Sequence, residues 1–278
     1  MLTIVAPAKI NLTLEILGKR PDGYHEIRSI VQTVNLNDKL HFKPGDRIEF
    51  ECDVPGWDYE KSLVSKTVSL LRGNARKGAA VEIEKKIPLV AGLGGDSSDA
   101  AAVLRGLNIL WELRLSLREL ANLALQLGSD VPLFIHGGTV LMEGRGGKLT
   151  PLPPMPHMTA VIFVPPMPGL ERKTEQLYSR VKPADYTAGH LTDDFVQWLN
   201  KREKSTSPVL FNVFDYIAPG VFPGLKESRQ RFLEAGAPEV HMAGSGPALY
   251  TLTQDAAVAG RICSSLGAQG LESYQADF

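Results

Sequence analysis

A glycine-rich segment in the first half of the chain constrains its fold more than any other feature. It reads Pro88-Leu-Val-Ala-Gly-Leu-Gly-Gly-Asp96 and runs directly into Ser97-Ser-Asp-Ala-Ala-Ala102, whose capping and small side chains are typical of a helix start. A glycine loop that feeds a helix presents unpaired backbone N–H groups and the positive end of the helix dipole, and both favour a bound phosphate. The local sequence leaves open a tight turn before a core helix.

This loop differs from two common nucleotide-binding signatures. The G-x-x-x-x-G-K-[ST] spacing of a P-loop is absent. A dinucleotide fingerprint requires a third glycine at the position that Ser97 occupies. A phosphate site here would therefore be of neither type.

The first strand carries an unusual lysine. Ile10, Leu12, Leu14 and Ile16 alternate with polar residues, which predicts a strand with one buried face. Lys9 stands at the entry to this strand in Pro7-Ala-Lys-Ile-Asn-Leu12. On local grounds, protection of a sheet edge by a charged side chain is the simpler interpretation.

Three further motifs each allow a structural and a functional interpretation. In Gly128-Ser-Asp-Val-Pro132, Asp130 is either a turn former or a proton acceptor for a substrate hydroxyl. In Gly23-Tyr-His-Glu26, the aromatic ring and the imidazole are either structural or together recognise a base. Gly244-Ser-Gly-Pro247 is either a plain hairpin loop or a loop that contacts a ligand.

The order of the predicted elements suggests two domains. Strands are expected over 26–36, 39–42, 47–52 and 80–85, a helix over 63–71, a helix that opens with a capping box at Ser116 and Glu119, and a hairpin over 139–152. A proline-rich stretch over 151–156 is the best linker. After it, with helices near 172–182, 192–202, 208–217, 225–235 and 255–266, the order is β-α-β-β-α-β, the ferredoxin-like order.

Composition restricts the classes of protein. Thirty basic and thirty-one acidic residues give a net charge of −1, which argues against a protein that binds nucleic acid or a membrane surface over its whole length. The two cysteines, Cys52 and Cys263, lie far apart and predict neither a disulfide framework nor a cysteine zinc site. Without a predicted export signal or spanning helix, we expect a cytoplasmic protein.

Taken together, these motifs resemble the GHMP kinases, small-molecule kinases whose fold is unrelated to that of P-loop enzymes. The lysine strand, the glycine-serine loop and the late glycine loop occur in the family's order. The resemblance implies an α+β, two-domain GHMP kinase fold. Residues 1–153 would form an N-terminal domain that is ribosomal-protein-S5-domain-2-like, and residues 154–278 a C-terminal domain that is ferredoxin-like.

Within this family the chain resembles the members that act on cytidine diphosphate-methylerythritol in the non-mevalonate isoprenoid pathway. The matching segments are Pro7–Leu12, Gly18–Glu26, Leu127–Phe134 and Glu143–Gly146. The implied reaction transfers the γ-phosphoryl group of ATP, with Mg²⁺ as the counterion of the nucleotide, to the 2-hydroxyl of the erythritol moiety. A kinase of the mevalonate, sugar or homoserine type is the alternative within the family, and a non-catalytic binding module is the alternative outside it.

The resemblance also implies roles for individual residues. Asp130 would take the proton of the acceptor hydroxyl, and Lys9 would lie against that hydroxyl or against Asp130. The residues expected to bind the nucleotide phosphates are Pro88, Ala91, Gly92, Leu93, Gly94, Gly95, Asp96, Ser97 and Ser98. Those expected to bind the substrate are Asn11, Tyr24, His25, Asp130, Thr174, Tyr178, Gly244 and Ser245, with no metal site made by protein side chains alone.

The chain departs from the family pattern at two positions. Asp96 stands where the family commonly has glycine, and because a carboxylate repels a triphosphate we expect it to point outward. Ser62 stands where an asparagine near the adenine is usual. The expected partners are small molecules, without nucleic acid or membrane, and the expected state is a monomer or weak homodimer.

Overall fold

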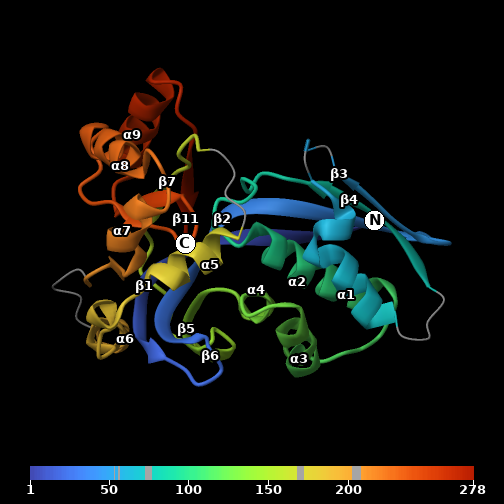
Figure 1. Ribbon diagram of the computed structural model, residues 1–278. Coiled ribbons are helices and arrows are strands. Elements are labelled where there is room, and N and C mark those ends of the chain that lie inside the picture. Colours follow the sequence, from blue (N-terminus) through green and yellow to red (C-terminus); the bar gives the residue numbers. More distant parts are fainter. Residues whose placement is uncertain (53, 56, 73–76, 168–171, 202–207) are drawn as a thin grey trace. The chain divides into compact units, whose positions relative to one another are not determined.

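The computed structural model describes residues 1–52, 54–55, 57–72, 77–167, 172–201 and 208–278 of an α+β protein (Figure 1). The chain divides into two compact units, which are discontinuous in sequence. Unit 1 comprises Met1–Ala8, Leu36–Leu89 and Gly94–Gly137, and unit 2 comprises Lys9–Asn35, Val90–Leu93 and Gly138–Phe278. Strands β1 (Leu2–Lys19) and β2 (His25–Gly45) contribute residues to both units. The domain boundary at 153/154 stays a prediction.

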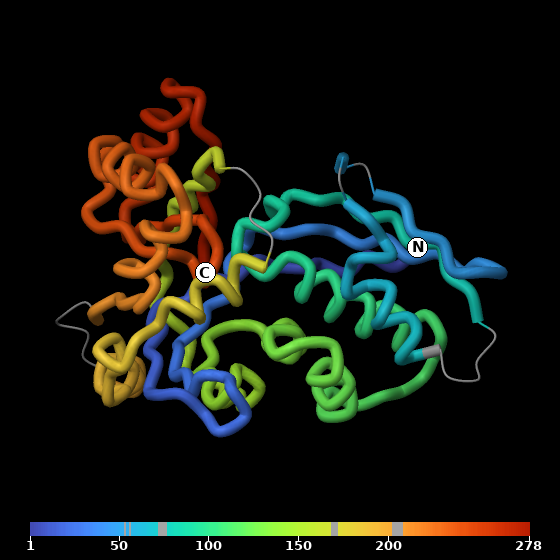
Figure 2. Tube along the Cα trace, viewed as in Figure 1, coloured from blue at the N-terminus to red at the C-terminus, as the bar shows by residue number. Residues whose placement is uncertain are grey.

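Unit 1 packs helices against a sheet. Strand β4 (Gly78–Glu84) pairs antiparallel with the second half of β2 and parallel with β3 (Ile48–Cys52). The helices are α1 (Leu63–Arg72), α2 (Gly95–Leu110), α3 (Leu117–Leu127) and α4 (Val131–His136), with a short 3-10 turn η1 (Tyr59–Lys61) before α1. Figure 2 shows the traces of α1 and α2 running beside each other. A Cβ atom on Gly106 of α2 would overlap the ring of Phe42, so glycine permits the close approach of this helix to β2.

Unit 2 contains the predicted hairpin. Strands β5 (Thr139–Gly144) and β6 (Lys148–Pro151) pair antiparallel, which confirms that prediction, and β5 also pairs with β2 over Ile27–Gln32. The short strand β8 (Phe211–Asn212) pairs parallel with β1 at Thr13 and Leu14.

A second sheet in unit 2 has the order β11-β7-β10-β9, and its neighbouring strands are antiparallel. Its strands are β7 (Thr159–Phe163), β9 (His241–Met242), β10 (Leu249–Thr253) and β11 (Ser273–Asp277). Helices α8 (Leu225–Glu234) and α9 (Ala256–Ala268) lie beside it (Figure 1). This arrangement confirms the predicted β-α-β-β-α-β order of the second half.

The long connection between β7 and α8 contains α5 (Lys173–Arg180), η2 (Pro183–Asp185), α6 (His190–Asn200), α7 (Phe214–Ile217) and η3 (Ala218–Gly220). The predicted helix over 208–217 is wrong, because β8 occupies part of that segment and α7 has only one turn. The side chain of Asn212 accepts a hydrogen bond from Phe214 N at 3.0 Å. Such a local side-chain bond to the backbone competes with helix formation.

The prediction that β1 buries only one face is also wrong. The residues from Ala8 to Ile16 are buried on both faces. Two polar side chains of this strand bond to the start of α6, since Thr13 Oγ1 lies 2.9 Å from Thr192 Oγ1, and Glu15 Oε2 accepts a hydrogen bond from Thr192 N at 2.7 Å. Alternation of apolar and polar residues therefore marks here a strand with an apolar face and a buried polar face.

Candidate active site

Lys9 and Asn11 lie on the buried polar face of β1, in unit 2. Lys9 Nζ donates to Asn11 Oδ1 at 2.7 Å and to Ala243 O at 3.3 Å, and the residue is 6% exposed. Asn11 Nδ2 in turn donates to Ser29 Oγ at 2.7 Å. A lysine so deeply buried does not protect an edge, which removes the simpler interpretation of Lys9. The hydrogen bonds of its ammonium group offset part of the cost of burying this charge.

Asp130 precedes α4 in unit 1 and is half-buried. Its backbone carbonyl accepts a hydrogen bond from Leu133 N at 3.2 Å, but its side chain makes no capping bond to the helix. The carboxylate is therefore not used as a helix cap, and it can accept a proton from a ligand. The first turn of α4 contains Pro132, which has no backbone N–H to cap.

The glycine-rich loop passes from unit 1 through unit 2 and back to unit 1. In unit 2, Leu93 O accepts a hydrogen bond from Lys9 N at 2.9 Å, and Ala91 O accepts one from Ala248 N at 3.1 Å. Gly92 and Gly94 have φ values of 90° and 80°, which L side chains rarely adopt. The loop is thus fixed by backbone bonds and depends on glycine at these two positions.

In unit 1 the loop ends at the start of α2. The helix begins at Gly95, earlier than predicted, and Gly94 at its N-cap position offers no side-chain acceptor. The first-turn N–H groups therefore have no side-chain cap, which suits an anion. Ser97 is half-buried, whereas Ser98 is 1% exposed and its Oγ has no hydrogen-bond partner among the described residues.

Asp96 is exposed, as expected of a residue that points outward, but its carboxylate is also engaged. Asp96 Oδ1 accepts hydrogen bonds from Ser62 Oγ at 2.6 Å and from Leu63 N at 3.1 Å, at the start of α1. Thus the two positions at which the chain departs from the family pattern are bonded to each other. The carboxylate caps α1, a role that was not predicted because Ser62 and Asp96 are 34 positions apart in the sequence.

The late glycine loop lies against Lys9 and the first glycine loop within unit 2. A Cβ atom on Gly244 would overlap Lys9 Nζ and would lie 3.2 Å from Asn11 Oδ1, and one on Gly246 would overlap the backbone of Ala91. Ser245 Oγ lies 3.0 Å from Thr174 Oγ1, at the start of α5. This loop is more than a plain hairpin turn, because it packs directly on candidate site residues.

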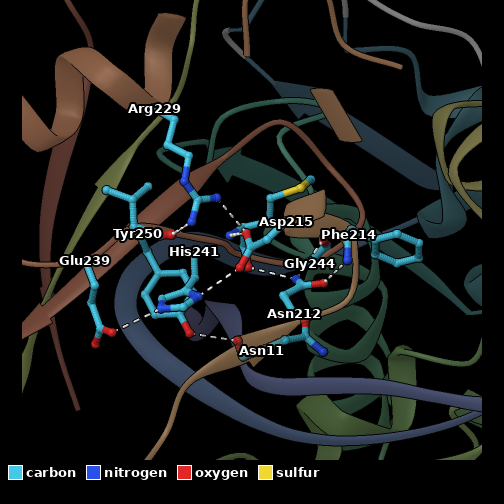
Figure 3. A network of polar contacts seen from close by, with 11 residues as sticks. Asn11, Asn212, Phe214, Asp215, Arg229, Glu239, His241, Gly244 and Tyr250 are labelled. Atoms are coloured by element: carbon cyan, nitrogen blue, oxygen red, sulfur yellow. Dashed lines mark hydrogen bonds and ion pairs between the residues drawn. The ribbon is translucent and has the colours of Figure 1, made fainter. Parts of the chain in front are cut away.

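A network of polar side chains bonds to the backbone of the late glycine loop and of the strand before it (Figure 3). Asn212 Nδ2 donates to Gly244 O at 3.2 Å and to Met242 O at 2.9 Å, and the buried Tyr250 donates to Asn11 O at 2.9 Å. Further from the loop, four charged residues form what we call the His241 network. Its members are Asp215, Arg229, Glu239 and His241.

His241 is the centre of this network. Its Nδ1 lies 2.9 Å from Asp215 Oδ2 and its Nε2 lies 3.3 Å from Glu239 Oε2. Burial lowers the pKa of His241, but hydrogen bonds to the two carboxylates outweigh burial and raise this pKa to about 9. The imidazole is therefore protonated at neutral pH.

The predicted base-binding residues in unit 2 are aromatic neighbours. The rings of His25 and Tyr178 are 5.3 Å apart and inclined by 30°, and Tyr178 also meets Phe214 edge-on at 5.0 Å. The pKa of His25 is lowered, mainly by burial and to a smaller extent by the charge of Lys19, so that the neutral imidazole is favoured.

Tyr24, the other predicted base-binding residue, is 54% exposed, and the guanidinium of Arg145 lies 3.6 Å above its ring. Arg145 was not among the predicted site residues, although its position between two glycines of the hairpin turn could have suggested it.

Lys173 is a second candidate site residue that was not predicted from the sequence. It directly precedes Thr174, and its ammonium donates to Val90 O in the glycine loop. Burial, followed by the charge of Lys9, lowers the pKa of Lys173 to about 8. A second cation is thus held beside the loop in unit 2.

The described residues contain no group of three or more His, Cys, Asp or Glu side chains that could hold a metal ion.

Comparison with known proteins identifies relatives along the whole chain. The family model of the GHMP kinases N terminal domain matches residues 62–138. The chain is 45% identical to 4-diphosphocytidyl-2-C-methyl-D-erythritol kinase of Dehalococcoides mccartyi (strain BAV1), over 99% of this chain and 97% of that protein. It is 40% identical to the protein of the same name from Pelotomaculum thermopropionicum, over 92% of this chain and 90% of that one.

Solved structures agree with these sequence matches. A crystal structure of 4-(cytidine 5'-diphospho)-2C-methyl-D-erythritol kinase matches with a TM-score of 0.84 and 33% identity, over 99% of this chain and 98% of that chain. A homoserine kinase from Cytophaga hutchinsonii matches with a TM-score of 0.74 at 20% identity, over 99% of this chain and 93% of that chain. The second match supports the fold alone.

Proposed function

Because this chain belongs to the 4-diphosphocytidyl-2-C-methyl-D-erythritol kinases, a family with the GHMP kinase fold, we propose that it is an ATP-dependent kinase of that substrate. It transfers the γ-phosphoryl group of ATP to the 2-hydroxyl of the erythritol moiety, a step of the non-mevalonate route to isoprenoid precursors. The observation that carries this proposal is 45% identity over 99% of the chain. We also propose that it acts in the cytoplasm as a monomer or weak homodimer, with residues 1–153 and 154–278 as its two domains.

The chemistry requires an activated alcohol and a stabilised phosphoryl group. Phosphoryl transfer has a loose transition state, so that catalysis depends mainly on positioning and on charge stabilisation. We assign Asp130 as the acceptor of the hydroxyl proton, because its half-buried carboxylate is not used as a helix cap. We assign Lys9 as the cation that favours the developing alkoxide, and its buried ammonium suits this role.

The triphosphate is assigned to the glycine-rich loop. The uncapped first turn of α2 offers backbone N–H groups, and Ser97 and Ser98 offer hydroxyl donors. Mg²⁺ would be held chiefly by the phosphate oxygens, and it would neutralise their charge. Ala91, Gly92 and Leu93 contribute the part of the loop in unit 2 that the late glycine loop supports.

The cytidine is assigned to the aromatic residues of unit 2. Tyr24 and Tyr178 would stack on the base, and the neutral His25 would bond to its edge. Asn11, Thr174, Gly244 and Ser245 would contact the rest of the substrate. Since base stacking on an aromatic ring contributes about 1–3 kcal/mol, Tyr24→Ala is expected to raise the KM for the cytidine substrate with little change in the KM for ATP.

Phosphorylation assays test this proposal. The wild-type protein is offered ATP with the cytidine diphosphate substrate, mevalonate, homoserine or a sugar, and we expect turnover of the first alone. Asp130→Asn should lower kcat by about 100-fold or more, as is typical of a proton-transfer group, and Lys9→Met should also lower it. Asp46→Asn, which changes an exposed carboxylate of unit 1, is the matched control. Turnover of another alcohol, or full activity of Asp130→Asn, would contradict the substrate or the role.

A further inference from the structure

Three buried charged residues of unit 1 have no part in the function proposed above. Lys85 Nζ lies 2.5 Å from Asp38 Oδ2 and 2.6 Å from Asp99 Oδ2. The side chain of Lys85 is 3% exposed, and the two carboxylates are 0% exposed. We call these residues the Lys85 triad.

The triad connects the residues just before the glycine-rich loop with those just after it. Asp38 Oδ1 accepts hydrogen bonds from Lys86 N at 2.6 Å and Ile87 N at 2.8 Å, directly before Pro88. Asp99 lies in α2, directly after Ser98. Lys85 bonds to both carboxylates, so the two ends of the loop are held to a common point.

The first residue of α2 also packs on the triad. A Cβ atom on Gly95 would lie 3.5 Å from Lys85 Nζ and 3.1 Å from Ile87 Cγ2. The ammonium is therefore close to the helix turn whose N–H groups are assigned to the triphosphate. A displacement of Lys85 would be felt by these donors, because close-packed interiors transmit strain.

The charges of the triad are not balanced. Two carboxylates share one ammonium, and Asp99 Oδ1 has no hydrogen-bond partner among the described residues. Burial raises the pKa of Asp99, and the charge of Asp38 raises it further. The charge of Lys85 lowers this pKa, but the net result is still a raised value of about 7. The unpartnered Oδ1 and the raised pKa together mark Asp99 as the carboxylate of the triad that can hold a proton, and the charged groups that act on it are Lys85, after β4, and Asp38, on β2.

We propose that Lys85 and Asp99 are positioning residues for the phosphate loop, and that Asp99 takes up a proton when a triphosphate binds to this loop. The inference rests on the proposed function, since it requires the triphosphate to bind at the start of α2. An anion at that place raises the free energy of the ionised Asp99 and so favours its neutral form. The proton comes from the solvent, and the protein part of the site becomes less negative as the nucleotide adds charge.

Isothermal titration calorimetry tests the proton uptake. The Mg²⁺ complex of adenosine 5′-(β,γ-imido)triphosphate is titrated into the wild type at pH 7 in buffers of different ionisation enthalpy, which gives the number of protons bound. Asp99→Asn should lose part of this uptake, and Asp46→Asn should keep all of it. Because protonation of the nucleotide itself is common to all three proteins, the difference isolates Asp99. Equal uptake by the wild type and Asp99→Asn would overturn the proposal.

A second measurement keeps the test valid if Asp99→Asn does not fold. In the wild type and also in Lys173→Met, which removes the cation beside the loop whose pKa is about 8, the affinity for the same nucleotide complex should decrease as the pH rises through 7, because deprotonated Asp99 opposes binding. For the positioning role, Lys85→Met should weaken this affinity by about 10-fold or more, whereas the KM for the acceptor alcohol should stay within about threefold. An affinity that is independent of pH from 6 to 8.5 would contradict the proton uptake.

The failure of this inference differs from the failure of the proposed function. If the wild type neither binds the nucleotide nor phosphorylates the cytidine substrate, the proposed function is wrong. If the wild type does both but binds without proton uptake through Asp99, only the inference is wrong.

Discussion

The Lys85 triad and the His241 network both combine carboxylates with cations, but they favour different charge states of their central groups. The neutral form is favoured for Asp99, whereas the charged form is favoured for His241. The triad is almost fully buried and has two carboxylates for one ammonium. In the network, Asp215 is 7% exposed and Glu239 is 53% exposed, and two carboxylates meet two cations when His241 is protonated. Burial and the second carboxylate raise the pKa of Asp99 and so favour its neutral form, whereas two carboxylates keep His241 charged in spite of burial. The balance of charges around a buried group, and not burial alone, therefore decides whether that group stays ionised.

The largest expected effect is that of removing the cation from the triad. Lys85→Met leaves two buried carboxylates without an ammonium, and breaking a buried pair in this way costs about 3–5 kcal/mol. Urea denaturation should show this loss in the free energy of unfolding. Lys61→Met is the control, because Lys61 pairs with Asp58 at the surface, where such pairs contribute about 0–1 kcal/mol. Equal losses in the two variants would mean that burial of the triad has no energetic consequence.

The two regions should make the free energy of unfolding depend on pH in different pH ranges. The pKa of His241 is about 9 when folded and 6.5 when unfolded, so its contribution is complete below pH 6.5 and is lost as the pH rises to about 9. This contribution amounts to about 3 kcal/mol if each pKa unit is worth about 1.4 kcal/mol. The pKa of Asp99 is also raised, from 3.8 to about 7, so stability due to Asp99 decreases between about pH 4 and 7.

Denaturation over pH 4 to 9.5 in three variants measures these windows. His241→Gln should remove the decrease between pH 6.5 and 9, and Asp99→Asn should remove the one between pH 4 and 7. His157→Gln, which changes an exposed imidazole of unit 2, should keep both. If His241→Gln instead changed the lower window, the assignment of the two groups would be reversed.

A somewhat smaller loss is expected when the network loses its central acceptor. Asp215 accepts hydrogen bonds from the backbone N–H of Met242 at 2.8 Å and from the side chains of His241 and Arg229. Asp215→Ala leaves these donors without their acceptor, and unsatisfied buried donors cost about 1–3 kcal/mol. Because the two cations can reach water, the loss should be below that of Lys85→Met. Asp194→Ala, at an exposed position of unit 2, should change stability by less than about 0.5 kcal/mol.

The sequence predicts local features of both regions and misses the long-range ones. The capping box of Ser116 and Glu119 was predictable and is confirmed, because its residues are three positions apart. The Lys85 triad was not predictable, since Lys85 lies 47 and 14 positions from its two partners. The burial of the polar face of β1 was also not predictable, because Thr192, which bonds to Glu15 on this face, lies 177 positions away in the sequence. No periodicity records which distant donor will satisfy a buried acceptor.

The same limit applies to the candidate site. Local motifs singled out Lys9, Asp130 and both glycine loops, since glycine and charged residues at strand and helix ends are informative in themselves. Lys173 and Arg145 were missed, because an isolated cation in a sequence resembles any solvated one. What distinguishes them is contact with Val90 O and with the ring of Tyr24, and these contacts exist only in the folded chain.

The smallest expected effect concerns Asp96, an exposed carboxylate that belongs to neither region. It caps α1 through Leu63 N and Ser62 Oγ, and loss of a cap costs about 0.5–2 kcal/mol. For Asp96→Ala we expect a loss near the lower end of this range, because water can replace the lost bonds, and a KM for ATP within about threefold of the wild type. Ser62→Ala, which removes the neighbouring hydroxyl, should give a similar result. Much weaker ATP binding in Asp96→Ala alone would show that its carboxylate serves the nucleotide rather than the helix.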